Sequence, residues 1–203
     1  MKVFLDPGHG GVVDGTYVTA GKRSPLWPDG TQLFEGVFNR RVVEKIKFYL
    51  SSFEIDYLDV VNSNYDVQLT KRVFKANEEA KKTPDCIYVS IHANAGPDSA
   101  TGYEIYTSHG QTKSDTLATK IAAEFAKLDP EAKIRMDKTD GDVDKEEHFY
   151  VLDKTIVPAV LIESGFMTNY DECKKLMSEE YQEIIAKSTA QGVLEYYKSL
   201  KLK

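Results

Sequence analysis

The sequence predicts a single α/β domain in three layers, with a mixed, mostly parallel sheet and helices on both of its faces. Short apolar runs typical of buried strands alternate with longer segments in which apolar residues recur every three or four positions. The chain has 203 residues, enough to bury one sizeable core. Repeats, low-complexity tracts and Pro/Gly linkers are absent from the sequence, so we expect one domain over residues 1–203.

The strands are predicted where apolar residues run together between turn signals. They cover residues 2–6, 55–61, 86–91, 102–106 and 157–163. Helices are predicted from apolar stripes over residues 38–50, 66–82, 117–128 and 181–193. In the second helix Asp66 is suited to be the N-cap, and the apolar stripe is formed by Leu69, Val73 and Ala76. Two polar stretches, residues 12–34 and 137–147, are predicted to be surface loops.

The composition argues against several classes of partner. The formal net charge is −6, which gives no electrostatic support for nucleic acid or an anionic membrane. No apolar stretch approaches membrane-spanning length, and the apolar residues 3–5 are too few for a signal peptide. Cys86 is expected to be a small core residue. Cys86 and Cys173 lie far apart, and their spacing neither requires a disulfide nor decides against one.

The chemistry begins at His9, in the stretch DPGHGG at residues 6–11. A phosphate-binding loop is one interpretation of these glycines, but it needs a GxxxxGK[ST] or GxGxxG run that enters a helix. Here the turn-like residues VVDGT follow, without the lysine. The alternative is a histidine directed at a reaction centre, and this alternative requires partners.

Three residues at strand or helix ends can supply those partners. Glu35 stands immediately before a helix, where it could simply favour the helix dipole. His92 follows the strand CIYVSI, although buried structural histidines also occur. Glu163 ends the apolar run VPAVLIE, where a carboxylate is costly unless it is paired, metal-bound or catalytic. Two imidazoles and one carboxylate can hold Zn²⁺ with a fourth position open for water, and a further carboxylate can then move protons.

Taken together, these motifs resemble the zinc-dependent N-acetylmuramoyl-L-alanine amidases, a family that includes bacterial cell-separation amidases and many phage endolysins. The resemblance spans nearly the whole chain, through LDPGHGG at 5–11, FEGVFNR at 34–40, SIHANA at 90–95, GYEIY at 102–106 and FYVLDKTIVPAVLIESGFMTN at 149–169. It implies a sheet of about six strands, and Zn²⁺ bound by His9, Glu35 and His92 with Glu163 as the catalytic carboxylate. It also implies peptidoglycan as the partner, cleaved between N-acetylmuramic acid and the L-alanine of the stem peptide.

Other functions stay open at this point. A zinc peptidase or carboxypeptidase could use the same ligands on another amide of the stem peptide. A catalytically silent wall-binding module should lack one of the four residues, and none is missing. We expect a monomeric phage-type lytic enzyme, held in the host cytoplasm until its release to the wall. The alternative is a bacterial wall-remodelling amidase, secreted or periplasmic as part of a longer precursor.

The loop over residues 12–34 is longer than is usual in the resembling family, and it could form a lip over the cleft. Lys22 or Arg23 could contact the acidic stem peptide, and Trp27 could stack on sugar or peptide. The competing interpretation is a solvated loop with one anchoring aromatic residue.

Four further polar residues flank the expected cleft. Asn94 could contact substrate or fix the loop that carries His92. His148 could hydrogen-bond substrate, or it could be an ordinary surface histidine. Glu104 could pair with a neighbouring base. Asp153 stands where the family often has an arginine, and its carboxylate would repel a carboxylate of the stem peptide.

Overall fold

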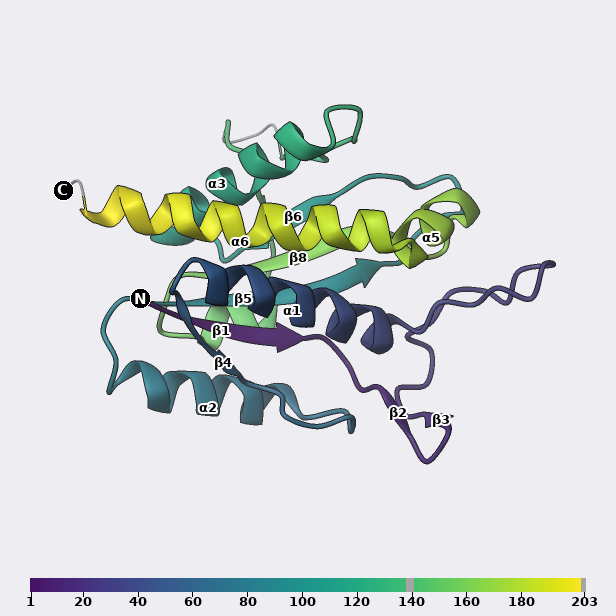
Figure 1. The fold of residues 1–203 in the computed structure, drawn as a ribbon, viewed down its shortest axis with the longest axis horizontal. Coiled ribbons are helices and arrows are strands. Elements are labelled where there is room, and N and C mark those ends of the chain that lie inside the picture. The colour runs from purple at the N-terminus through teal and green to yellow at the C-terminus, as the bar shows by residue number, and fades with distance from the viewer. Residues whose placement is uncertain (138–140, 202–203) are drawn as a thin grey trace.

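The computed structural model describes residues 1–137 and 141–201, and it has the predicted α/β architecture (Figure 1). Six strands form one sheet in the order β4-β1-β5-β8-β6-β7. The first four of these strands are mutually parallel, β6 runs antiparallel to β8, and β7 runs parallel to β6. Their bounds are β1 (Lys2–Pro7), β4 (Asp56–Asp59), β5 (Cys86–Asn94), β6 (Glu104–Thr107), β7 (Lys145–Glu146) and β8 (Ala159–Phe166).

Helices cover both faces of the sheet. On one face lie α1 (Glu35–Ser52), α3 (Lys113–Leu128) and α6 (Glu179–Lys201), with the short α5 (Tyr170–Met177) beside them. On the other face lie α2 (Leu69–Ala80) and α4 (Tyr150–Lys154). Figure 1 shows α1 and α6 on one side of the strands and α2 on the other.

The apolar runs in the sequence reflect this double cover. In β1, Val3 and Leu5 pack into the cluster under α1 and α6, while Phe4 packs into the cluster under α2. In β5, Ile87 likewise packs into the cluster under α1 and α6, and Tyr88 into the cluster under α2. Strands that are buried on both faces lose the polar alternation of half-exposed strands, which is why they were recognisable as continuous apolar segments.

The second helix differs from its prediction. It begins at Leu69 with Gln68 as the N-cap residue, so the expectation that Asp66 caps it was wrong. Asp66 instead accepts hydrogen bonds from Arg72 and Thr19. Leu69, predicted to be core, is the first residue of the helix and is 49% exposed.

The two long loops contain short strands. Residues 12–34 include the hairpin of β2 (Val12–Val13) and β3 (Thr16–Tyr17), followed by an excursion that Arg23 and Phe34 close with an antiparallel bridge. The predicted loop 137–147 contains β7, and its residues 138–140 lie outside the described part of the chain. Cys86 and Cys173 are both buried and free, so they do not form a disulfide. Within the described ranges, no helix has both the length and the apolar content needed to cross a bilayer.

Candidate metal centre

His9 is held at the carboxyl end of β1 in an unusual backbone conformation. Its φ of 63° lies in the left-handed region, which non-glycine residues seldom adopt. Arg40 donates a hydrogen bond to the His9 carbonyl (2.9 Å), and Asn39 donates one to the Gly8 carbonyl (3.0 Å). A Cβ atom at Gly8 would overlap the His92 imidazole, so only glycine permits the two histidines to approach each other here.

Glu35 joins the two histidines from the first turn of α1. Its carboxylate is nearly fully buried, and Oε1 lies 3.2 Å from His9 Nε2 and 3.0 Å from His92 Nδ1. The Ala93 amide donates a further hydrogen bond to the same oxygen (3.3 Å). The possible ligand atoms of His9, Glu35 and His92 all lie within 4.8 Å of one another.

This donor set fits a zinc ion. Zinc takes imidazole nitrogen and carboxylate oxygen at about 2.0–2.2 Å in tetrahedral geometry, which places neighbouring ligand atoms about 3.3 Å apart. The two nitrogen–oxygen separations of 3.2 and 3.0 Å match that spacing. Three protein ligands would leave the fourth position open, as in catalytic rather than structural zinc sites.

The electrostatics of the site also favour a cation. Burial raises the pKa of Glu35, but the hydrogen bonds from His9 and His92 outweigh burial and hold that pKa below its ordinary value. Burial lowers the pKa of His92, yet the hydrogen bond to Glu35 and the charges of Glu163 and Glu35 raise it overall. Both pKa shifts show that positive charge is stabilised between the imidazole rings and the carboxylates. A divalent cation can supply that positive charge.

Glu163 lies beside His92 on the adjacent strand. The register of β5 and β8 pairs His92 with Glu163, and that of β8 and β6 pairs Glu163 with Glu104. Glu163 Oε2 is buried and has no hydrogen-bond partner in the described ranges. Burial and the charges of Glu35 and Glu104 raise the pKa of Glu163 to about 8, although His92 and Lys22 act in the opposite direction. A carboxyl with this pKa can both accept and release a proton near neutral pH.

These residues open into a cleft of about 430 Å³. Its lining includes the apolar or aromatic residues Leu69, Leu161, Met167, Phe149 and Tyr150. Sequence reasoning missed these apolar residues as site residues. Of these, Leu69 and Tyr150 are 49% and 39% exposed.

The five predicted substrate-contacting residues occupy different places. Lys22 and Asn94 line the cleft. Trp27 packs edge-on against Tyr170 of α5, with the ring centroids 5.2 Å apart, so it anchors the loop at a distance from the cleft lining.

Arg23 and His148 also lie outside the cleft lining. Arg23 lies at the base of the loop excursion, in the bridge to Phe34. His148 Nδ1 pairs with the Asp153 carboxylate (3.1 Å) on the surface.

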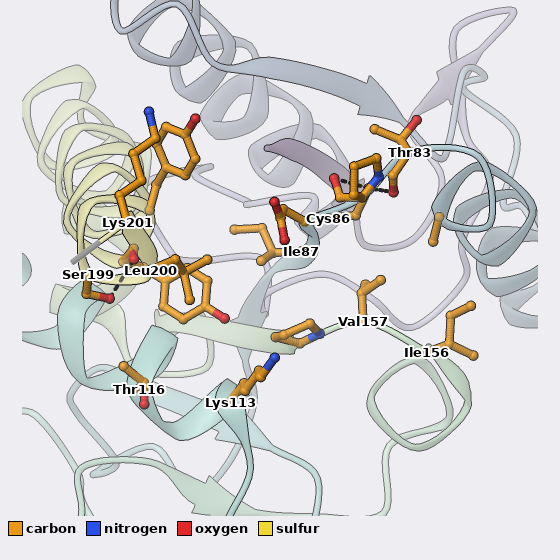
Figure 2. A pocket seen from close by; sticks show the side chains of 16 residues that line it. Thr83, Cys86, Ile87, Lys113, Thr116, Ile156, Val157, Ser199, Leu200 and Lys201 are labelled. Carbon is orange, nitrogen blue, oxygen red and sulfur yellow. Dashed lines mark hydrogen bonds between the residues drawn. The ribbon is translucent and has the colours of Figure 1, made fainter. Parts of the chain in front are cut away.

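A larger cavity, about 620 Å³, lies elsewhere. Figure 2 shows its walls around the start of β5 and the last turn of α6, with Cys86, Ile87, Lys113 and Leu200 among the lining residues. His9 and His92 lie at the carboxyl ends of β1 and β5, and this cavity lies at the amino end of β5. Volume alone would therefore have identified the wrong region.

A His/Glu/His set with an adjoining buried carboxylate, on an α/β sheet, has the donor types of a metallohydrolase site. The sequence matches the model of the N-acetylmuramoyl-L-alanine amidase family over residues 3–195. The chain therefore belongs to this family and is an amidase of the N-acetylmuramoyl-L-alanine type.

Individual relatives agree with the family assignment. The uncharacterized protein YqiI of Bacillus subtilis is 31% identical over 96% of this chain and 84% of its own length. The endolysin of Bacillus phage SPP1 is 29% identical over 95% of this chain and 65% of its own length. The crystal structure of an N-acetylmuramoyl-L-alanine amidase from Clostridium difficile 630 superposes with a TM-score of 0.77 at 29% identity, and the match covers 98% of this chain and 97% of that one.

Proposed function

We propose that this chain uses one zinc ion to hydrolyse the amide bond between N-acetylmuramic acid and the L-alanine of the peptidoglycan stem peptide. The observation that carries the proposal is the convergence of His9, Glu35 and His92 within 4.8 Å, beside Glu163 on the next strand. Four residues from four distant parts of the sequence meet at one point, and each is of the type that amide hydrolysis requires.

The chemistry divides between the ion and the chain. Zinc bound at this site supplies Lewis-acid activation of water and of the amide carbonyl. His9, Glu35 and His92 hold the ion, and the hydrogen bond from Ala93 fixes the Glu35 carboxylate. Glu163 accepts one proton from the attacking water and delivers it to the departing alanine nitrogen, so the carboxyl returns to its starting state.

The decisive experiment separates metal binding from proton transfer. In Glu163→Gln we expect the turnover number to fall by about 10²–10⁴, the usual contribution of general acid–base catalysis, while zinc content stays at one ion per chain. In Glu35→Gln we expect the zinc itself to be lost. A zinc-loaded Glu163→Gln enzyme with full activity would exclude the assigned role of Glu163.

Product analysis tests the bond that is cleaved. Mass spectrometry of digested sacculi should show intact stem peptides with a new L-alanine amino terminus. New termini within the stem peptide would identify a peptidase instead.

For the biological setting we propose a phage-type lytic enzyme acting as a monomer, with a catalytic domain over residues 1–203. The similarity to the SPP1 endolysin supports this setting. Rapid clearing of a suspension of sacculi by the purified protein, without an added activator, is the expected behaviour. Slow trimming without clearing would favour a bacterial wall-remodelling amidase.

A further inference from the structure

A second charged cluster adjoins the cleft and is centred on Glu104 of β6. The Glu104 side chain is 2% exposed, and its two oxygens accept hydrogen bonds from four donors. Arg135 Nε (2.6 Å) and Lys145 Nζ (2.9 Å) bind Oε1, whereas Asn94 Nδ2 (2.6 Å) and Tyr106 OH (2.8 Å) bind Oε2. Burial raises the pKa of Glu104, but these donors hold it below its ordinary value overall, so the carboxylate is ionised.

Within the cluster the cations outnumber the anion. The Arg135 and Lys145 side chains are 33% and 28% exposed, and together they share a single buried carboxylate. Apart from those to Glu104, the Arg135 side chain makes one long hydrogen bond in the described part of the chain, from Nη1 to the Thr101 carbonyl (3.4 Å), and Nη2 makes no hydrogen bond there. Both cations therefore retain hydrogen-bond donors that can reach a ligand from solvent.

The two cations are also held in place. The Arg135 guanidinium lies 5.2 Å from the centroid of the Phe166 ring, and the Lys145 ammonium lies 5.4 Å from the centroid of the Tyr106 ring. Stacking on an aromatic face and pairing with a buried carboxylate restrict the rotamers of both side chains. Less conformational entropy is then lost when an anion binds.

The cluster lies at a defined distance from the candidate metal centre. His92, Glu163 and Glu104 are register partners across three neighbouring strands, which are spaced about 4.8 Å apart. The Glu104 backbone is therefore about 10 Å from the His92 backbone along this row. Asn94 links the cluster to the cleft because it lines the cleft and donates to Glu104. An extended peptide covers about 3.3–3.6 Å per residue, so about three residues span that distance.

We infer that Arg135 and Lys145 form a binding site for a carboxylate in the peptide part of the substrate, within about three residues of the scissile amide. The inference rests on the proposed function, since it takes the peptide to extend from the metal centre towards β6. Glu104 is the internal counter-ion that fixes the two cations, and a fork-shaped guanidinium beside an ammonium suits a carboxylate.

Two substrates test the site. A muramyl tripeptide is prepared with its side-chain and terminal carboxyls free, and a second one is prepared with all of them converted to carboxamides. The wild type should cleave the acid form at least about 10-fold more efficiently, as kcat/KM. Arg135→Gln and Lys145→Gln should each raise KM for the acid form by about 5- to 10-fold, leave kcat nearly unchanged, and leave the carboxamide form unaffected.

Controls separate binding from folding. Lys127→Gln removes a similar charge from an exposed pair with Glu124 on α3, which includes no member of the Glu104 cluster, and should leave both substrates unaffected. Zinc content and the unfolding temperature are measured for every variant. If Arg135→Gln destabilises the fold through its contact with Phe166, Arg135→Lys keeps the charge and should recover part of the preference for the acid form.

The possible failures can be told apart. Dissociation constants of both peptides, measured by calorimetry with Glu163→Gln as the host, report binding even without turnover. Wild type that cleaves neither substrate while its Glu163→Gln form still binds the acid peptide more tightly would overturn the proposed function and keep the carboxylate site. An acid-to-amide ratio that is equal in wild type, Arg135→Gln and Lys145→Gln would overturn the carboxylate site alone.

Discussion

Replacing Arg72 by methionine should destabilise the protein severely. Arg72 is 1% exposed, and its Nη1 lies 2.6 Å from Asp6 Oδ1, itself 1% exposed at the end of β1. The same guanidinium donates to the carbonyls of Pro7 (3.1 Å) and Val67 (2.7 Å). Removing one partner of a buried ion pair costs about 3–5 kcal/mol, because the remaining charge is left in a low-dielectric interior. That is a large share of the 5–15 kcal/mol by which domains are typically stable.

Urea unfolding of three variants measures this effect. We expect Arg72→Met to lower the free energy of unfolding by about 3–5 kcal/mol. The double variant Asp6→Asn/Arg72→Met should recover at least about 1 kcal/mol of that loss, because no uncompensated buried charge remains. Lys198→Met, which breaks an exposed pair with Glu195, is the matched control and should cost under about 1 kcal/mol. A loss below about 1 kcal/mol in Arg72→Met, or a double variant no more stable than the single one, would refute the reasoning.

Three further predictions address pH, backbone contact and metal. Burial raises the pKa of Asp144 to about 6, although the hydrogen bond from Thr107 acts in the opposite direction. The folded state therefore binds a proton that the unfolded state has lost, and the free energy of unfolding falls as the pH rises from about 4 to 6. Asp144→Asn should remove about 2–3 kcal/mol of that fall, and unfolding curves of both proteins across this pH range measure the difference. Gly36→Ala should weaken zinc binding, seen by competition with a chromophoric chelator, and should cost at least about 1–3 kcal/mol, because the added Cβ would overlap the Gly10 carbonyl. Zinc at 100 times its dissociation constant should stabilise the wild type by about 2.7 kcal/mol in thermal unfolding, and chelation should reverse this.

Much of the fold could be predicted because its strands are buried on both sides. The runs at residues 2–6 and 86–91 correspond to β1 and β5 within a few residues. The short elements could not be predicted: α4 has five residues and β7 has two, so neither is long enough to show a period. Leu69 misled the prediction because helical spacing places it on the apolar stripe, whereas the point at which α2 begins decides its exposure.

Part of the candidate site could also be predicted from the sequence. His92 and Glu163 stood out as polar residues at apolar strands, and the structure places them side by side in β5 and β8. Spacing along the sequence carries no information about Arg135 and Lys145, which meet Glu104 only through the pairing of strands and the return of a loop. The apolar residues of the cleft lining were missed for the same reason, since in the sequence they resemble ordinary core residues.

The excursion over residues 23–34 has a consequence for evolution and for engineering. Arg23 and Phe34 are bridge partners, and the Ser24 amide donates to the Leu33 carbonyl (2.9 Å). The two ends of the segment are therefore held together at its base. Next to this closure, the Glu35 amide donates a hydrogen bond to the Lys22 carbonyl (3.0 Å). A segment of another length or chemistry between Arg23 and Phe34 should therefore leave Glu35 in its position, so the surroundings of the site can vary here while its candidate ligands stay in place.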